Sequence, residues 1–183
     1  MSGSLFMGKK TMPAKANKRK KESRVRRFLV AAVTILLPLA VGTMASICTV
    51  AAQESFNEFN KPPLAPPAWV FPVVWTVLYL MMGVASYLVY RKKVHNWDER
   101  RLRIAELVVF YVQLFFNFSW TILFFNSDMK YFAFGWLITM WFMILAFILM
   151  AFKNHKVAGW LMVPYILWCT FAAYLNISIA ILN

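Results

Sequence analysis

The chain has 183 residues, of which 61% are hydrophobic and 17% aromatic, and only six are glycine. Because soluble domains are roughly half apolar, this composition excludes an ordinary soluble domain and indicates a protein that crosses a membrane several times. The formal net charge of +13 is concentrated in residues 9–27 without a nucleic-acid-binding motif, so we expect anionic lipid headgroups as its partner and no nucleic acid.

Residues 1–27 contain ten basic residues and a single acid, Glu22, without apolar periodicity, and this pattern predicts a disordered basic tail. Residues 28–183 read as one all-α membrane domain, a five-helix transmembrane bundle, because the apolar runs reach the roughly 20 residues that a membrane span needs. The helices are predicted at about 28–51, 68–90, 102–126, 131–152 and 157–182. Pro38 is expected to kink the first helix.

The distribution of positive charge predicts the orientation of this bundle. Eighteen of the 20 Lys and Arg residues fall on the side that carries the tail, against Lys61 and Lys130 on the other side. Because positively charged loops stay on the cytoplasmic side, the N-terminus is predicted to be cytoplasmic and the C-terminus outside. We expect a bacterial cytoplasmic membrane.

A proline-rich segment separates the first two predicted helices. It contains four prolines within six residues: Pro62, Pro63, Pro66 and Pro67. Proline fixes the backbone and removes hydrogen-bond donors, so this segment must be a stiff connector outside the hydrocarbon. Aromatic residues follow it at helical spacing, which suggests a rigid lid over an aromatic pocket.

The usual catalytic and metal-binding constellations are missing from the sequence. His95 and His155 fall in predicted loops, and Cys48 and Cys169 lie within apolar runs as small packing residues. No carboxylate pair, Cys/His cluster or phosphate loop accompanies them. We therefore predict no cofactor and no metal, and expect any ligand to be held by apolar contact and a few hydrogen bonds.

Faces on three of the predicted helices carry residues suited to such a pocket. Trp75 and Tyr79 lie one turn apart on the second helix, and Gln113 and Asn117 lie one turn apart on the third. On the fifth helix one stripe is formed at three- and four-residue steps by Tyr165, Trp168, Ala172 and Asn176. These faces form either a flat aromatic slot or an ordinary packed core, and spacing alone leaves both readings open.

Three blocks carry a resemblance to a known family: NKPPLAPPAWVFPVVWTVLYLMMGVASY at 60–87, QLFFNFSWTILFF at 113–125 and AGWLMVPYILWCTFAAYLN at 158–176. From about Pro38 to Asn183 the chain resembles the tryptophan-rich sensory protein family, also called the translocator protein or peripheral-type benzodiazepine receptor family. The resemblance implies a five-helix bundle, commonly a homodimer. It also implies binding of porphyrins, above all protoporphyrin IX, and in some members of cholesterol or other planar apolar ligands.

Carried over residue by residue, the resemblance implicates Trp75 and Trp168 in contact with the porphyrin. It aligns Asn117, Tyr165, Ala172 and Asn176 with further family positions. Two features of the family are absent, because Ser55 and Leu64 stand where its loop often has tryptophan, and no basic residue follows Tyr174 to complete a sterol-recognition pattern. These departures lower the expectation of efficient degradation and of cholesterol binding.

The sequence therefore predicts a tetrapyrrole-binding membrane protein that acts in porphyrin transport, sensing or stress regulation. Its ligand residues are expected to be Trp75, Tyr79, Gln113, Asn117, Tyr165, Trp168, Ala172 and Asn176, with the Lys61 ammonium paired to a propionate. One alternative is an enzyme that degrades the porphyrin with light and oxygen, in which Trp75 and Trp168 would be catalytic. Another is a structural or regulatory membrane partner without a small-molecule ligand.

Overall fold

The computed structural model describes residues 14–49, 59–126 and 129–183, and all regular secondary structure in these ranges is helical. The helices are α1 (Ala14–Cys48), α3 (Val70–Arg91), α4 (Trp97–Asn126), α5 (Lys130–Asn154) and α6 (Lys156–Leu182). All five are long and apolar enough to cross a membrane. The prediction of an all-α bundle with five transmembrane helices is thus confirmed.

The first helix begins at Ala14, not at about Phe28, so the prediction of a disordered tail is wrong for residues 14–27. Lys, Arg and Ala are good helix formers, and a helix already nucleated in the apolar run extends into neighbouring residues at little cost. Residues 1–13, the rest of the predicted tail, lie outside the described residues. The basic stretch therefore continues the first membrane helix as a charged arm.

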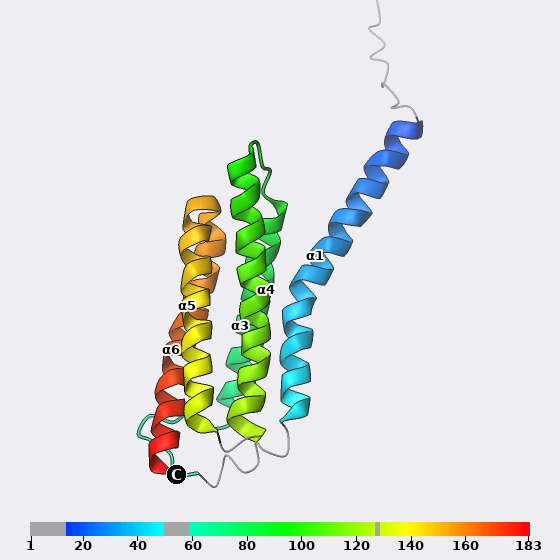
Figure 1. The fold of residues 1–183 in the computed structure, drawn as a ribbon. Helices are drawn as coiled ribbons and strands as arrows, with labels where there is room; N and C mark the ends of the chain where they lie inside the picture. Colours follow the sequence, from blue (N-terminus) through cyan, green and yellow to red (C-terminus); the bar gives the residue numbers. More distant parts are fainter. Residues whose placement is uncertain (1–13, 50–58, 127–128) are drawn as a thin grey trace, which may run out of the picture.

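The five helices pack as a ring rather than in sequence order. Helix α3 contacts α1 and α6, helix α5 contacts α4 and α6, and α1 closes the ring against α4. In Figure 1, helices α3, α4, α5 and α6 run side by side, and α1 leans away from them towards its N-terminal end. Pro38, which cannot donate a helical hydrogen bond, lies inside α1 where the kink is expected.

Two glycines, Gly42 on α1 and Gly83 on α3, allow these two helices to approach each other closely. A Cβ atom on Gly83 would lie 2.7 Å from the backbone of Ile35, and one on Gly42 would lie 2.1 Å from Cε2 of Tyr79. Real Cβ atoms do not approach other atoms so closely, so both positions require a residue without a side chain. The Tyr79 ring consequently lies directly against the backbone of α1.

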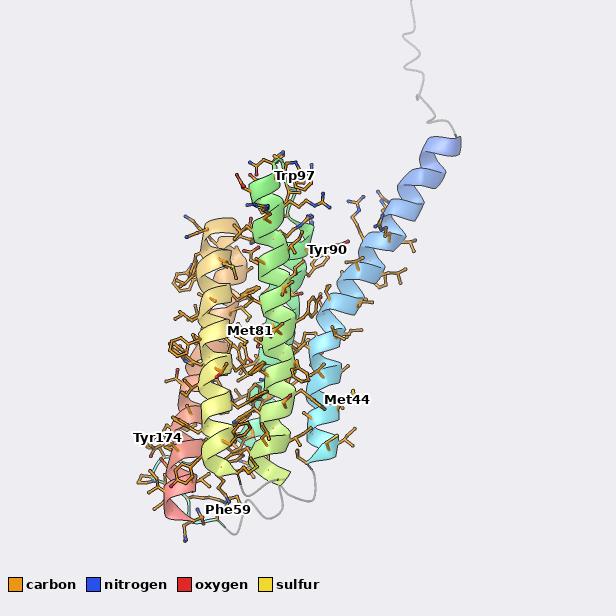
Figure 2. The ribbon with its side chains drawn as sticks, viewed as in Figure 1. Met44, Phe59, Met81, Tyr90, Trp97 and Tyr174 are labelled. Atoms are coloured by element: carbon orange, nitrogen blue, oxygen red, sulfur yellow. The ribbon has the colours of Figure 1, made fainter. Side chains whose placement is uncertain are left out.

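The two ends of the bundle differ in their connections. Figure 2 shows Phe59 and Tyr174 at one end and Tyr90 and Trp97 at the other. The first end carries the proline-rich loop and the C-terminus of α6. We call it the pocket end, because the pocket described in the next subsection lies there. We call the second the basic end, because Lys92 and Lys93 lie in the α3–α4 connection there and the adjoining helix ends carry Arg91, Lys153 and Lys156.

The described part of the proline-rich loop is fastened to the C-terminal end of α6. The backbone N–H of Asn60 donates to Oδ1 of Asn183 at 2.9 Å, and Nδ2 of Asn183 donates to the Asn60 carbonyl at 3.2 Å. The Tyr174 hydroxyl donates to the Pro63 carbonyl at 2.7 Å. Leu64 has a φ of 73°, a left-handed conformation that costs a residue with a side chain about 1–2 kcal/mol. These bonds hold the loop in one place.

Candidate functional site: an aromatic pocket

A pocket of about 300 Å³ lies at the pocket end among α1, α3, α4 and α6. It is framed by Gly42 and Ala45 from α1, Trp75 and Tyr79 from α3, Trp120 and Phe124 from α4, and Ala172 and Asn176 from α6. The residues that line it within the described part of the chain are all uncharged. Any ligand held there would be recognised by shape, apolar contact and hydrogen bonds rather than by charge pairing.

Aromatic rings from α3 and α4 form the wall of the pocket. The Trp75 ring stacks on Tyr79 with centroids 5.5 Å apart and lies 6.3 Å from the ring of Trp120. Trp120 stacks in turn on Phe124 at 5.6 Å, with an interplanar angle of 20°. Rings at these separations attract one another beyond their simple burial, so the wall is a pre-arranged aromatic surface.

A chain of buried hydrogen bonds lies behind this wall. The Tyr79 hydroxyl donates to Oδ1 of Asn117 at 2.5 Å, and Nδ2 of Asn117 donates to the Tyr165 hydroxyl at 3.0 Å. The Tyr165 hydroxyl donates to Oε1 of Gln113 at 2.9 Å. Because buried hydroxyl and amide groups are costly when unpaired, this network fixes the orientation of the Tyr79 ring. It joins α3, α4 and α6 beneath the pocket.

Asn176 is held at the other side of the pocket by two partners. Its Oδ1 accepts from the Trp120 indole N–H at 3.2 Å, and its Nδ2 donates to the Lys130 carbonyl at 3.0 Å. Asn176 has no measurable exposed surface although it lines the pocket. It therefore positions the Trp120 ring, and its amide is already occupied in this arrangement.

The predicted site residues fall into three groups in the structure. Trp75, Tyr79, Ala172 and Asn176 line the pocket. Gln113, Asn117 and Tyr165 lie behind it, in the hydrogen-bonded network that supports Tyr79. Trp168 and Lys61 are not among the residues that line the pocket.

Trp168 lies on α6 between two other rings rather than facing Trp75 across the pocket. Its ring centroid is 6.0 Å from that of Phe71 and 5.5 Å from that of Phe171. The indole nitrogen is buried without a hydrogen-bond partner. Lys61 is exposed on the proline-rich loop. Between residue 59 and the start of α3, Ala68 alone lines the pocket.

The sequence analysis did not single out several residues that line the pocket, of which Trp120 is the largest. Trp120 follows Asn117 by three residues and Gln113 by seven, so it shares their face of α4, and this spacing is the signal that could have found it. The contribution of α1 through Gly42 and Thr43 was also missed. A helix with few polar residues gives no sequence indication of which face meets a cavity.

Metal chemistry finds no support in the part of the chain that the structure describes. No group of three or more His, Cys, Asp and Glu side chains lies close enough there to hold a metal ion. Cys169 is buried and Cys48 is exposed, and the two do not form a disulfide bond. The pocket offers indole, phenol and amide groups instead, which bind flat apolar molecules by stacking and by directed hydrogen bonds.

Five apolar helices, four of which enclose an aromatic pocket, define a polytopic integral membrane protein with a small-molecule-sized cavity. A sequence model of the TspO/MBR family matches residues 34–182, and the chain belongs to this family. It is similar to the tryptophan-rich protein TspO of Chlorobaculum tepidum, with 34% identity over 86% of this chain and 98% of the relative. The tryptophan-rich protein TspO of Archaeoglobus fulgidus is 31% identical over 82% of this chain and 94% of the relative. The translocator protein of Ovis aries is 31% identical over 66% of this chain and 70% of the relative.

Proposed function

We propose that this protein binds a planar tetrapyrrole, with protoporphyrin IX as the leading ligand, in the aromatic pocket at the pocket end. Bound ligand would serve porphyrin transport, sensing or stress regulation. The observation that carries the proposal is the wall of Trp75, Tyr79 and Trp120, whose rings are stacked or tilted against one another at 5.5 to 6.3 Å. A flat conjugated macrocycle is the class of ligand that such a wall suits best.

The size and the exposed rim of the pocket support a binding mode in which only part of the porphyrin macrocycle enters the pocket. About 300 Å³ is at the small end of the range for drug-sized ligands, which is roughly 300–1,000 Å³. Several rim residues from α1 and α3 are exposed, namely Thr43, Ser46, Pro72 and Thr76. A porphyrin would therefore insert one edge between α1 and α3 and leave its propionates towards the exposed rim.

Apolar burial would supply most of the binding free energy. Each Å² of apolar surface removed from water contributes about 25 cal/mol, and the cost of association offsets part of this sum. The hydroxyls of Tyr79 and Tyr165 are already paired within the protein, so the ligand gains little from them directly. Their role is to hold the stacking surface in place.

The test is a titration of the purified protein with protoporphyrin IX in the dark, followed by tryptophan fluorescence. We expect saturable quenching that is strongly weakened in the double variant Trp75→Leu/Trp120→Leu. The matched control is Trp97→Leu/Trp160→Leu, since these two side chains are 74% and 65% exposed and lie outside the pocket. Equal loss of affinity in both double variants would contradict the proposed site.

A second candidate function is degradation of the bound porphyrin with light and oxygen. The observation that favours it is the continuous series of rings from Trp75 to Tyr79 and Tyr165, at 5.5 and 6.2 Å from the Trp75 ring. In such a series the indole would give an electron to the excited porphyrin and a tyrosine would reduce the indole in turn. Both side chains would be restored as the reaction proceeds, so that the net step is oxidation of the porphyrin by oxygen. Trp168, the other predicted catalytic tryptophan, is not part of this series.

Illumination of the same samples separates the alternatives. Loss of porphyrin absorbance that needs light, oxygen and Trp75 would favour the enzyme, whereas saturable quenching without bleaching would favour a binding or sensing protein. If no saturable quenching occurs, the pocket is not a porphyrin site and a structural or regulatory partner protein becomes the better description.

A further inference from the structure

Besides the indole nitrogen of Trp168, three side chains in the described part of the bundle have a buried polar atom without a hydrogen-bond partner. They are Ser86 on α3 and Glu106 and Gln113 on α4, and none of the three has measurable exposed surface. The unpaired atoms are the Ser86 hydroxyl oxygen, Oε1 of Glu106 and Nε2 of Gln113. Because buried polar atoms in proteins are nearly always paired, each of these requires a partner that the protein itself does not supply.

The three residues lie along one line through the bundle. Glu106 precedes Gln113 by seven residues, so both project from the same face of α4 about 10 Å apart along the helix axis. The hydrogen bond from Tyr79 to Asn117 shows that these two residues lie at the same height along the bundle axis. Ser86 follows Tyr79 by seven residues on α3 and so lies about two turns nearer the basic end. Since α3 and α4 run in opposite directions, Ser86 lies level with the interval between Glu106 and Gln113.

The Ser86 hydroxyl is unusual among the hydroxyl groups of these helices. The hydroxyls of Thr76, Thr121 and Thr170 each donate to the carbonyl four residues earlier, which satisfies them within their own helix. Ser86 makes no such bond. Its hydroxyl is therefore available to a molecule outside its own helix.

Each end of this line is connected to a hydrogen-bonded group. Towards the pocket, Oε1 of Gln113 accepts from Tyr165 in the network beneath Tyr79. Towards the basic end, Oε2 of Glu106 accepts from Asn154, and the Lys92 ammonium donates to the Asn154 side chain and backbone carbonyl. Among the described residues of α3 and α4, the buried side-chain atoms without a partner thus belong to Ser86 and to Gln113 and Glu106, the two residues at which the networks end.

We propose that Ser86, Gln113 and Glu106 bind a short chain of internal water molecules that joins the network beneath the pocket to the Glu106–Asn154–Lys92 cluster. The amide N–H of Gln113 needs an acceptor, the carboxylate oxygen of Glu106 needs a donor, and the Ser86 hydroxyl can use either. Water can serve all three because it both donates and accepts hydrogen bonds. Internal waters typically make two to four hydrogen bonds to such groups. The chain connects the two ends of the bundle through its interior and gives the basic end a hydrogen-bonded path to the pocket.

Gln113 provides a direct probe of this water, because the sequence contains only two glutamines, Gln53 and Gln113. Protein with side-chain ¹⁵N-labelled glutamine in lipid nanodiscs shows two amide NH₂ signals, and the Gln53→Asn variant assigns the one from Gln113. We expect a cross-peak between the Gln113 amide protons and a long-lived water molecule. No porphyrin is needed, so the outcome is independent of the proposed ligand.

Variants at Ser86 test the position of the water. Ser86→Val replaces the hydroxyl by apolar groups and should abolish the cross-peak, whereas Ser86→Thr should retain it. Ser119→Val is the matched control, because the Ser119 hydroxyl already donates to the Phe115 carbonyl at 2.8 Å and should leave the cross-peak unchanged. Absence of a water cross-peak in the unmodified protein, or an equal cross-peak in Ser86→Val, would overturn the proposal. If Ser86→Val does not fold, Ser86→Ala gives the same test with less added volume.

Discussion

The pocket end and the basic end of the bundle both bury polar groups, but they do so differently. At the pocket end the side chains of Tyr79, Asn117 and Asn176 are paired with other protein groups. Towards the basic end Glu106 is fully buried and one of its oxygens has no protein partner. A satisfied network fixes side chains in one arrangement, whereas an incomplete one must recruit water.

This difference separates a rigid aromatic surface, where we propose that the ligand binds, from an interior that we propose to be hydrated. The aromatic wall depends on hydrogen bonds behind it and on the absence of a side chain at Gly42 in front of it. The Glu106–Asn154–Lys92 cluster depends on polar groups from α4, from α5 and from the residue that follows α3, towards the basic end of the bundle. Changes at the pocket end should therefore alter stability and ligand binding together.

The largest effect is expected from Asn117→Leu. The change leaves the Tyr79 hydroxyl without an acceptor and the Tyr165 hydroxyl without a donor, and buried groups left unpaired cost about 1–3 kcal/mol each. Thermal unfolding in detergent should show a clear drop in midpoint. At the basic end, Asn154→Leu should cost less because Asn154 is only half-buried. A larger loss for Asn154→Leu would reverse the comparison.

Gly42→Ala should follow in size. Its new Cβ atom would lie 2.1 Å from the Tyr79 ring, so the ring must move into the pocket, and overpacking of this kind costs about 1–3 kcal/mol. We expect a lower unfolding midpoint. We also expect at least tenfold weaker affinity for protoporphyrin IX in the quenching titration. Gly135→Ala is the matched control, because a Cβ atom there meets nothing within 4 Å. Equal behaviour of the two variants would show that the Tyr79 contact is unimportant.

The next largest effect is expected from Trp75→Phe, and Trp168→Phe is the variant to compare it with. Trp75 lines the pocket and stacks on Tyr79, so its replacement should weaken ligand binding several-fold, equivalent to about 0.5–1.5 kcal/mol for an aromatic pair. Trp168 lies outside the pocket, so its replacement should change affinity less than twofold. Fluorescence or absorbance titration with porphyrin measures both. The reverse order would return Trp168 to the binding site predicted from sequence.

Tyr174→Phe should have the smallest effect. It removes the hydrogen bond to the Pro63 carbonyl, which contributes about 0.5–1.5 kcal/mol at most because Tyr174 is partly exposed. The expected result is faster amide hydrogen exchange in residues 59–69 with an unchanged unfolding midpoint. Tyr131→Phe, at a side chain that is 64% exposed, serves as the control and should leave that exchange unchanged. Unaltered exchange in Tyr174→Phe would mean that the asparagine bonds alone hold the loop.

The five-helix architecture was predictable because it is a local property. Each membrane helix satisfies its own backbone hydrogen bonds, so the length of an apolar run is enough to identify it. The same reasoning failed at residues 14–27, where charge suggested disorder although Lys and Arg extend a helix well. Periodicity also identified Trp75, Tyr79, Ala172 and Asn176, which do line one pocket.

The rest of the pocket depended on how the helices rotate and pack. The stripe on α6 is wide enough that Ala172 and Asn176 reach the pocket while Trp168 turns towards Phe71 and Phe171. Only the approach of α1 at Gly42 and Gly83 closes the cavity around Tyr79. The sequence alone thus determined which segments cross the membrane, since that depends on each helix separately. Tertiary structure decided which side chains share the cavity, since that depends on contacts between helices that no single periodicity contains.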